Sequence, residues 1–264
     1  MKLVVLGDPV EHSLSPVIHQ AALAAAGIPG SYQAQSVDGH GMVAAVSALR
    51  NGALDGANVT MPHKQVALAL ADRADELARR AGAANTLVRE GSAVAAYNTD
   101  VAGVRSAWKE AGLPTGCPIH ILGAGGAAAA ALLALEGSDL AISARDRSAA
   151  DALRVATGVE VTSVDWGTPL AGAVVVNATP IGMRCESLPA EVAVPEFGVF
   201  DMAYGAGRTP LVAAALAADL PYVDGEAMLI AQAAVSFELW TGVVAEHAAM
   251  RAALDVERTR RGIG

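Results

Sequence analysis

The sequence predicts an α/β protein with two domains, one of them a doubly wound Rossmann-type domain. Three observations predict this fold class. Segments typical of strands alternate with segments typical of helices along the chain. Near the middle, an apolar strand at residues 118–122 runs into glycines and then into an alanine-rich helix that ends at Leu135. The length of 264 residues is sufficient for two domains of common size.

The composition is that of a globular protein without a basic surface. Hydrophobic residues make up 53% of the chain and charged residues 17%, which excludes a disordered polypeptide. The net charge of -9 argues against a nucleic-acid partner, because such a partner requires a basic face. No segment approaches the roughly 20 apolar residues that cross a bilayer, and the apolar start is too short for an export signal. We therefore expect neither a nucleic-acid nor a membrane partner.

The two cysteines, Cys117 and Cys185, have the spacing of neither a metal site nor a disulfide framework. This pattern predicts that the protein binds no metal and works in the reducing cytoplasm.

The chain before the glycines predicts strands at 3–6 and 32–37, a strand that ends at the Pro62 turn, and a hairpin whose second strand is 93–97. We expect helices up to Gly27, at 42–49 and 72–80, and from the Asn98-Thr99-Asp100 segment to Gly112.

The chain after the glycines predicts strands at 140–143, 159–164, 173–176 and 199–204, a helix that begins at Thr209-Pro210, and a long helix from 225 to about 245. The charged residues after Arg251 are expected to fray. This alternation predicts a nucleotide-binding domain at residues 104–223, inserted into a substrate-binding domain formed by 1–103 and 224–264, with a cleft between the two.

Two serines lie where the first strand meets the first helix. Ser15 precedes Pro16 and is typical of a helix N-cap. Ser13 is not needed for that cap, so both hydroxyls can instead bind one carboxylate beside the helix N-terminus. The residues alone leave both interpretations open.

Lys64 and Asp100 are also candidates for two roles. Lys64 follows Thr60 at a strand end, where open α/β sheets bind ligands, although a lysine after a proline turn is commonly a solvated charge. Asp100 begins a helix and is equally explained as an N-cap. Gln232, in the last long helix, contacts either a ligand or a local partner.

The glycine-rich stretch is typical of a dinucleotide-binding turn. Gly123 permits the turn, Gly125 allows a phosphate to approach the backbone, and Ala128 suits close helix packing. The N–H groups at the helix start then favour a pyrophosphate. The same pattern also occurs in turns that serve packing alone.

The next strand ends at Ala144-Arg145-Asp146, which determines the cofactor. Arg145 would pair with the 2'-phosphate of NADP, whereas an acidic residue would bind the ribose hydroxyl of NAD. Arg145 comes first, so the sequence favours NADP, and Asp146 leaves NAD open. Thr179 lies in a polar loop after a later strand, at the same edge of the sheet.

These segments together resemble the shikimate dehydrogenase family, in the family's order and over nearly the whole chain. The matching motifs are Ser13-Leu14-Ser15-Pro16, Asn58-Val59-Thr60-Met61-Pro62-His63-Lys64, Gly82-Ala83-Ala84-Asn85-Thr86, Asn98-Thr99-Asp100, residues 123–127, Asp201-Met202-Ala203-Tyr204 and the 225–232 segment.

The resemblance implies a role for each matching residue. It implies that Lys64 and Asp100 are catalytic and that substrate contacts come from Ser13, Ser15, Thr60, Lys64, Asn85, Asp100, Tyr204 and Gln232. It implies cofactor contacts from Gly123, Ala124, Gly125, Gly126, Ala127, Ala144, Arg145, Asp146, Thr179, Met202 and Gly225.

The implied activity is the reversible NADPH-dependent reduction of 3-dehydroshikimate to shikimate in aromatic amino acid (chorismate) biosynthesis. Ser15 favours shikimate, because relatives that prefer quinate often have Thr there. Asp146 replaces a frequent Thr, which leaves strict preference for NADP open, and Ala130 replaces an Arg that often follows the glycines and grips the phosphate. The alternative activity is that of a quinate or dual quinate/shikimate dehydrogenase that uses NAD. A silent NADP-binding regulator would not need Lys64 and Asp100. We expect small-molecule partners only, and a monomer or homodimer.

Overall fold

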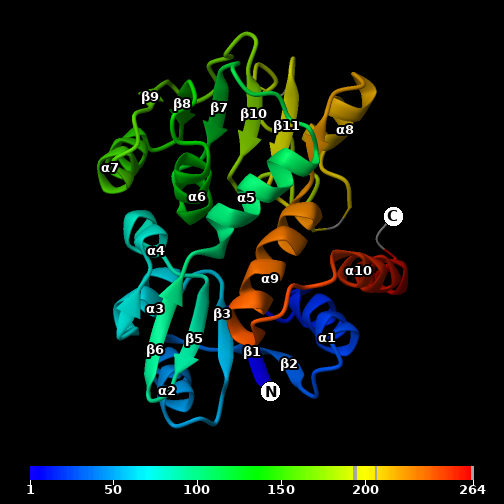
Figure 1. Cartoon of the computed structure of the whole chain (residues 1–264). Helices are drawn as coiled ribbons and strands as arrows, with labels where there is room; N and C mark the ends of the chain where they lie inside the picture. Colours follow the sequence, from blue (N-terminus) through cyan, green and yellow to red (C-terminus); the bar gives the residue numbers. More distant parts are fainter. Residues whose placement is uncertain (193–194, 206, 263–264) are drawn as a thin grey trace. The chain divides into compact units, whose positions relative to one another are not determined.

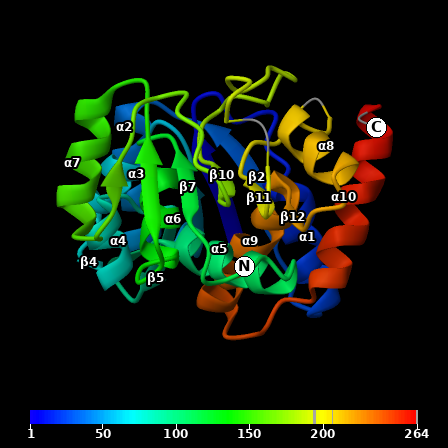
Figure 2. The same ribbon diagram turned by 90° about the horizontal axis from the view of Figure 1, so that it is seen from above.

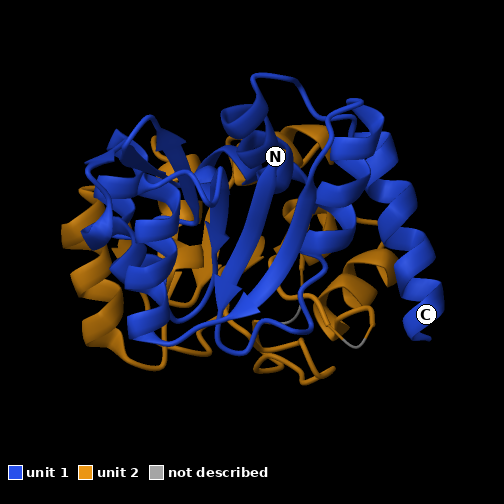
Figure 3. Ribbon diagram, turned by 90° about the horizontal axis from the view of Figure 1, so that it is seen from below, with its two compact units in different colours: residues 1–103, 230–262 blue, residues 104–229, 263–264 orange. Residues whose placement is uncertain are grey.

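The computed structural model describes residues 1–192, 195–205 and 207–262, which form two compact units (Figure 3). Unit 1 comprises residues 1–103 and 230–262, and unit 2 comprises residues 104–229. The boundaries fall within two helices, α5 (Thr99–Glu110) and α9 (Gly225–Thr241). The chain therefore leaves unit 1 once and returns to it once.

Unit 1 contains a mixed six-stranded sheet with the order β2-β1-β3-β5-β6-β4. The strands are β1 (Lys2–Gly7), β2 (Ser31–Ser36), β3 (Gly56–Val59), β4 (Arg73–Ala74), β5 (Thr86–Glu90) and β6 (Ala93–Tyr97). The helices that lie wholly in unit 1 are α1 (Ser15–Ala25), α2 (Gly39–Arg50), α3 (Lys64–Leu70), α4 (Glu76–Ala81) and α10 (His247–Arg261).

The central strands of unit 1 are buried because helices cover them. Leu6 of β1 and Val59 of β3 belong to one apolar cluster with Met42, Val46 and Leu49 of α2. Helix α1 packs against β2 and α10 (Figures 1 and 2). Since β1 and β3 are parallel neighbours, the loops that follow them leave the sheet at the same edge.

Unit 2 contains a parallel six-stranded sheet with the order β12-β11-β10-β7-β8-β9 (Figure 1). The strands are β7 (Ile119–Leu122), β8 (Leu140–Ser143), β9 (Thr162–Ser163), β10 (Val174–Asn177), β11 (Gly198–Asp201) and β12 (Tyr222–Val223). The helices between them are α6 (Gly126–Ala134), α7 (Arg147–Thr157) and α8 (Pro210–Ala217).

The strand order of unit 2 confirms the predicted Rossmann-type fold. From β9 to β12, the strands follow the 3-2-1-4-5-6 order of a doubly wound dinucleotide-binding sheet. The order reverses between β7 and β10, and ligands of such sheets bind at the carboxyl ends of the strands at that reversal. Unit 2 therefore presents the loops after β7 and β10 as its binding edge.

Two expectations about local structure are wrong. The segment from Arg251 to Arg261 is helical and does not fray, because Met250 and Leu254 of α10 are buried and Glu257 accepts hydrogen bonds from Arg260 and Arg261. The charged stretch 72–80 is not one helix. Arg73 and Ala74 form β4 beside β6, and Asp75 then caps α4 by accepting a hydrogen bond from the Ala78 N–H. No helix in the described part of the chain is long and apolar enough to span a membrane.

Candidate active site

The centre of the candidate site is an ion pair in unit 1. Lys64 is the first residue of α3, and Asp100 lies in the first turn of α5. The Lys64 Nζ lies 2.7 Å from the Asp100 Oδ2, although the two residues are 36 positions apart. Their side chains are 24% and 13% exposed, so both remain within reach of a small ligand. The fold therefore brings these two candidate residues into direct contact.

Asn85 holds the other oxygen of Asp100. It lies directly before β5, and its Nδ2 donates to the Asp100 Oδ1 at 2.8 Å and lies 3.3 Å from the Gln232 Oε1. Asn85 and Gln232 are both buried. The structure thus brings four predicted residues, from α3, the position before β5, α5 and α9, into one hydrogen-bonded group.

Ser13, Ser15 and Thr60 lie in the segments that follow β1 and β3, at the same edge of the unit 1 sheet. Ser13 and Ser15 follow β1, and Thr60 follows β3. In the structure Leu14 is the N-cap of α1, and the Ser15 N–H donates to the Ser13 Oγ. The interpretation of Ser15 as the N-cap is therefore wrong, because Ser15 is itself the first helical residue. Among the described hydrogen bonds, none links these hydroxyls directly to the Lys64 and Asp100 side chains.

The glycine-rich turn of unit 2 has the geometry of a phosphate cradle. Gly123 has φ +115°, and a Cβ there would lie 2.9 Å from the Ala178 carbonyl oxygen, so only glycine fits. This contact joins the loop after β7 to the Thr179 loop after β10, where the strand order reverses. Gly125 is the N-cap of α6 and provides no side-chain acceptor, which leaves the helix N–H groups available to an anion. The predicted residues Ala124, Gly126 and Ala127 complete the turn.

The side chains of Arg145 and Asp146 differ in their hydrogen-bond and ion-pair partners. Asp146 is the N-cap of α7, and its Oδ1 accepts hydrogen bonds from the Ser148 N–H and hydroxyl. The Ser148 hydroxyl lowers the pKa of Asp146, so its carboxylate is charged near neutral pH. Arg147 forms an ion pair with Asp165, whereas Arg145, next to Ala144, has no ion pair among the described residues. Arg145 is thus the arginine that remains available to a phosphate.

The other predicted contacts of unit 2 lie near its sheet edge. The Thr179 hydroxyl donates to the Asn177 Oδ1, and the Met202 N–H donates to the Asn177 carbonyl oxygen. At Gly225, the start of α9, a Cβ would lie 2.5 Å from the Ala203 carbonyl oxygen and 2.9 Å from the Tyr204 Cβ. Tyr204 is therefore close to Gly225 in unit 2, while the other predicted substrate contacts belong to unit 1.

Sequence reasoning missed several residues that support the ion pair. Asn58, Thr86, Thr99 and Ser236 are buried and hydrogen-bonded to one another or to Asn85. Ser236 gave one usable signal, since it follows Gln232 by four positions and so shares its face of the helix. Thr86 and Thr99 are adjacent to Asn85 and Asp100, and Asn58 lies two positions before Thr60, but the sequence does not show that their side chains meet.

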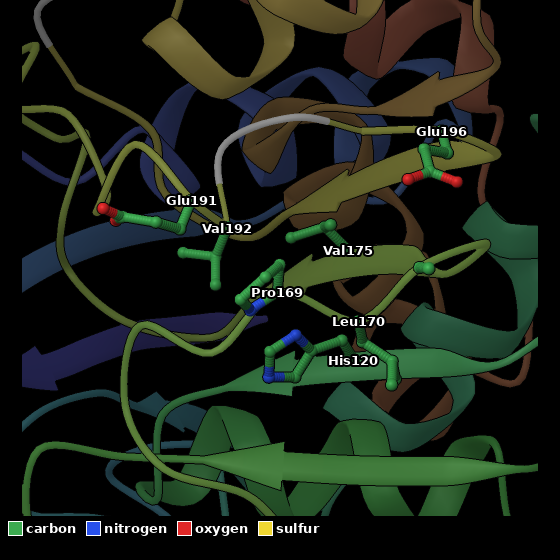
Figure 4. Close-up of a pocket in the computed structure, with 8 residues that line it drawn as sticks. His120, Pro169, Leu170, Val175, Glu191, Val192 and Glu196 are labelled. Carbon is green, nitrogen blue, oxygen red and sulfur yellow. The ribbon is translucent and has the colours of Figure 1, made fainter.

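Unit 2 also contains a cavity (Figure 4). It has a volume of about 160 Å³ and is lined by His120, Val175 and loop residues that include Pro169, Glu191 and Glu196. The His120 Nε2 lies 2.9 Å from the Ser143 Oγ, and burial lowers the pKa of His120. None of the predicted site residues lines this cavity, so the candidate site is defined by its polar clusters. The described residues contain no group of three or more His, Cys, Asp or Glu that could hold a metal ion.

Comparison with known proteins places the chain in a family. A profile described as the shikimate dehydrogenase substrate binding domain matches residues 5–87, and one described as the shikimate 5'-dehydrogenase C-terminal domain matches residues 225–254. The NADP(+) shikimate dehydrogenase of Rubrobacter xylanophilus is 41% identical over 96% of this chain and 94% of its own length. That of Anaeromyxobacter sp. is 40% identical over 95% and 94%.

A solved structure agrees with the sequence comparisons. The crystal structure of shikimate 5-dehydrogenase from Thermus thermophilus, in complex with NADP(H) and shikimate, has a TM-score of 0.88 and 33% identity. The match covers 97% of this chain and 99% of that one. The chain therefore belongs to the shikimate dehydrogenase family.

Proposed function

We propose that this protein is an NADP-dependent shikimate dehydrogenase that interconverts 3-dehydroshikimate and shikimate, with Lys64 and Asp100 as its catalytic pair. The observation that carries the proposal is the 2.7 Å contact between the Lys64 Nζ and the Asp100 Oδ2, in a chain whose relatives at 40–41% identity are named for this reaction. The alternative, a quinate-preferring enzyme that uses NAD, is disfavoured by those relatives.

The residues of unit 2 fit NADP. The cradle at Gly123 and the start of α6, which has no side-chain cap, match a pyrophosphate. Arg145, which has no ion pair within the described part of the chain, matches a 2'-phosphate. Arg145 and Asp146 would lie by the adenosine ribose, and Met202 and Gly225 by the nicotinamide. Bound NADP would supply the hydride acceptor for oxidation at C3 of shikimate, and NADPH would supply the hydride donor for the reverse reaction. The nucleotide-binding role of 104–223 and the substrate-binding role of 1–103 and 224–264 are part of this proposal.

The residues of unit 1 transfer the proton and orient the ring of the substrate. During reduction the Lys64 ammonium donates a proton to the oxygen on C3 as negative charge develops there, and during oxidation the Lys64 amine takes it back. Asp100 stabilises the lysine charge and orients the hydroxyl, and Asn85 fixes the Asp100 carboxylate. Ser13 and Ser15 bind the substrate carboxylate, and Thr60, Tyr204 and Gln232 contact its hydroxyls.

The test measures NADPH absorbance with shikimate and quinate, each with NADP and NAD. We expect the highest kcat/KM for shikimate with NADP. The Lys64→Ala variant should lower kcat by about 10²- to 10⁴-fold, with a smaller change in the shikimate KM, because general acid–base catalysis is lost. Arg50→Ala is the matched control, since Arg50 forms an exposed ion pair with Asp72 elsewhere in unit 1. An unchanged kcat in Lys64→Ala would remove this residue from the mechanism.

Two further statements belong to the proposal. The protein works in the cytoplasm, as its cysteine pattern predicts, and it is a monomer or homodimer. Sedimentation velocity at micromolar concentration decides between the two oligomeric states.

A further inference from the structure

Behind the Lys64–Asp100 pair lies a group of buried polar side chains that the mechanism above does not use. The group comprises Tyr32, Asn58, Thr86, Thr99 and Ser236, and it adjoins Asn85. Each of these side chains belongs to a residue that is 6% exposed or less. A buried polar group without a partner costs about 1–3 kcal/mol, so such a cluster is retained only where its hydrogen bonds are satisfied. These residues come from β2, β3, β5, α5 and α9.

The direction of the hydrogen bonds is fixed at one end by Tyr32. Its hydroxyl donates to the Asn58 Oδ1 at 2.7 Å, which makes that oxygen the acceptor end of the amide. The Asn58 Nδ2 therefore faces the Thr86 Oγ1 and the Ser236 Oγ, each at 3.1 Å. Ser236 receives this donor on one of its lone pairs.

Ser236 connects that amide to two threonines. Its Oγ lies 2.8 Å from the Thr86 Oγ1, 3.0 Å from the Thr99 Oγ1 and 3.2 Å from the Gln232 carbonyl oxygen, to which it can donate. The position is fully buried, so no solvent competes for these contacts. Ser236 is thus the point where α9 meets both threonine hydroxyls.

The two threonines in turn fix Asn85. The Thr99 N–H donates to the Asn85 Oδ1 at 2.8 Å, and the Thr86 hydroxyl lies 3.2 Å from the same oxygen. With its oxygen held on that side, the Asn85 amide must direct its Nδ2 toward the Asp100 Oδ1, which it reaches at 2.8 Å. The orientation of the catalytic carboxylate thus depends on groups that never touch it.

We propose that Ser236 is a positioning residue for the reaction, which acts through Thr86, Thr99 and Asn85 to hold the Asp100 carboxylate against Lys64. This inference rests on the proposed function. Without the Ser236 hydroxyl, both threonine hydroxyls lose a partner and can rotate. The Asn85 Oδ1 then keeps the Thr99 N–H but loses its fixed contacts with the two hydroxyls. A small misplacement of a catalytic group is enough to lower turnover by one to two orders of magnitude.

The experiment compares Ser236→Ala with wild type by steady-state kinetics on shikimate and NADP. We expect kcat to fall about 10-fold, with the NADP KM within twofold of wild type. Ser236→Cys retains the size of the side chain and a weak donor and acceptor, so it should recover part of the lost kcat. Thr241→Val is the matched control, because Thr241 lies on the same helix and makes three local hydrogen bonds outside the cluster.

A double-mutant comparison separates positioning from loss of folded protein. In an Asn85→Ala background, Ser236→Ala should lower kcat by less than twofold, because the residue through which it acts is gone. A purely structural effect would instead lower kcat by the same factor in both backgrounds, and that result would overturn the proposal.

Two other outcomes have a clear meaning. A Ser236→Ala enzyme with kcat within twofold of wild type would also overturn the proposal. If Ser236→Ala does not fold, Ser236→Cys provides the single and double variants for the same comparison. Failure of the proposed function is seen separately, as a wild-type protein that does not oxidise shikimate.

Discussion

At the residue scale, Asp146 combines helix capping with a charge where a phosphate is expected. Its Oδ1 is engaged by Ser148 and Ala149 at the start of α7, and the lowered pKa keeps the carboxylate ionised. A negative charge beside Arg145 opposes a 2'-phosphate but tolerates a ribose hydroxyl. The cap explains why an aspartate is stable at this position, and its charge weakens discrimination against NAD.

The variant Asp146→Thr separates these two effects. Threonine also caps helices, so the free energy of unfolding should change by less than about 1 kcal/mol. Removal of the charge should lower the Kd for NADP several-fold and leave the Kd for NAD equal or higher. Isothermal titration calorimetry of both cofactors at one ionic strength measures the ratio. An equal change for NAD and NADP would show that Asp146 does not sense the 2'-phosphate.

Arg145 is expected to act in the opposite direction. Arg145→Ala should weaken NADP binding at least about 10-fold and NAD binding much less, since only NADP has the phosphate that pairs with a guanidinium. Arg147→Ala provides the control, because Arg147 is two residues away and already paired with Asp165. Equal losses for the two cofactors in Arg145→Ala would mean that another group binds the 2'-phosphate.

His19 makes stability depend on pH. Its ring is fully buried, stacks on Tyr32 at a centroid distance of 4.4 Å, and has no hydrogen-bond partner among the described residues. Burial lowers the pKa of His19 from 6.5 to about 3. Between these values the unfolded chain binds a proton that the folded protein excludes, so this contribution to stability is complete above pH 6.5 and declines as the pH falls.

The pH dependence of the free energy of unfolding can be compared between wild type and His19→Phe. This variant keeps an aromatic ring on Tyr32 and cannot titrate. Between pH 6.5 and about pH 5, wild type should lose about 2 kcal/mol more unfolding free energy than the variant, from about 1.4 kcal/mol per pH unit. Urea unfolding at several pH values gives both curves. Parallel curves would mean that His19 takes up its proton in the folded state.

At the element scale, α5 and α9 lie in close contact at Gly103. A Cβ there would lie 2.8 Å from the Gln232 Cβ and 2.9 Å from the Gln232 backbone nitrogen, and a backbone atom cannot move aside by rotation. Alanine gains about 1 kcal/mol of helix propensity over glycine, whereas overpacking costs about 1–3 kcal/mol. We therefore expect the cost of overpacking to exceed the gain in helix propensity.

We predict that Gly103→Ala lowers the free energy of unfolding by about 1 kcal/mol and lowers kcat, because Gln232 and the Thr99 contacts must shift. Gly39→Ala is the matched control, since Gly39 begins α2 and has no atom near the added Cβ. Chemical denaturation and steady-state kinetics are measured on both variants. A Gly103→Ala protein that is more stable than wild type would show that the two helices separate without cost.

The sequence predicted elements where a local pattern determines them. The strand, glycine turn and apolar helix at 118–134 are confirmed, and so is the Thr209 cap before Pro210. The stretch 72–80 was predicted wrongly because its charges resemble a solvated helix, and β4 pairs with residues of β6 that lie 22 positions further along the chain. The end of α10 was missed for a similar reason, since Glu257 is satisfied by two arginines that a hydropathy pattern treats only as polar.

Only the residues at the centre of the site could be predicted from the sequence. Lys64, Asn85 and Asp100 stand in recognisable segments, and the structure joins them. Ser236 is an ordinary serine in an apolar helix, and its meaning arises from contacts with β3, β5 and α5 that are formed by the fold. At Ser15 a local pattern was misleading. A serine before a proline is typical of an N-cap, but the N-cap of α1 is Leu14.

At the scale of the whole molecule, each unit offers one sheet edge with its own chemistry. In unit 1 the loops after β1 and β3 carry Ser13, Thr60 and Lys64, which suit a carboxylate and a hydroxyl. In unit 2 the loops after β7 and β10 carry Gly123 and Thr179, which suit a pyrophosphate. The proposed reaction needs both ligands, so the division of roles between the units can be tested one ligand at a time.

Hydrogen exchange with each ligand alone tests this division. Shikimate should slow amide exchange in unit 1, at the start of α1, around Asn85 and at the start of α5, because bound ligand suppresses local opening. NADP should slow exchange at residues 123–127 and 144–146 of unit 2. Quinate and NAD at the same concentrations are the matched controls and should protect the same segments less. Protection of the unit 1 segments by NADP alone would contradict the assigned roles, because unit 1 would then hold part of the cofactor site.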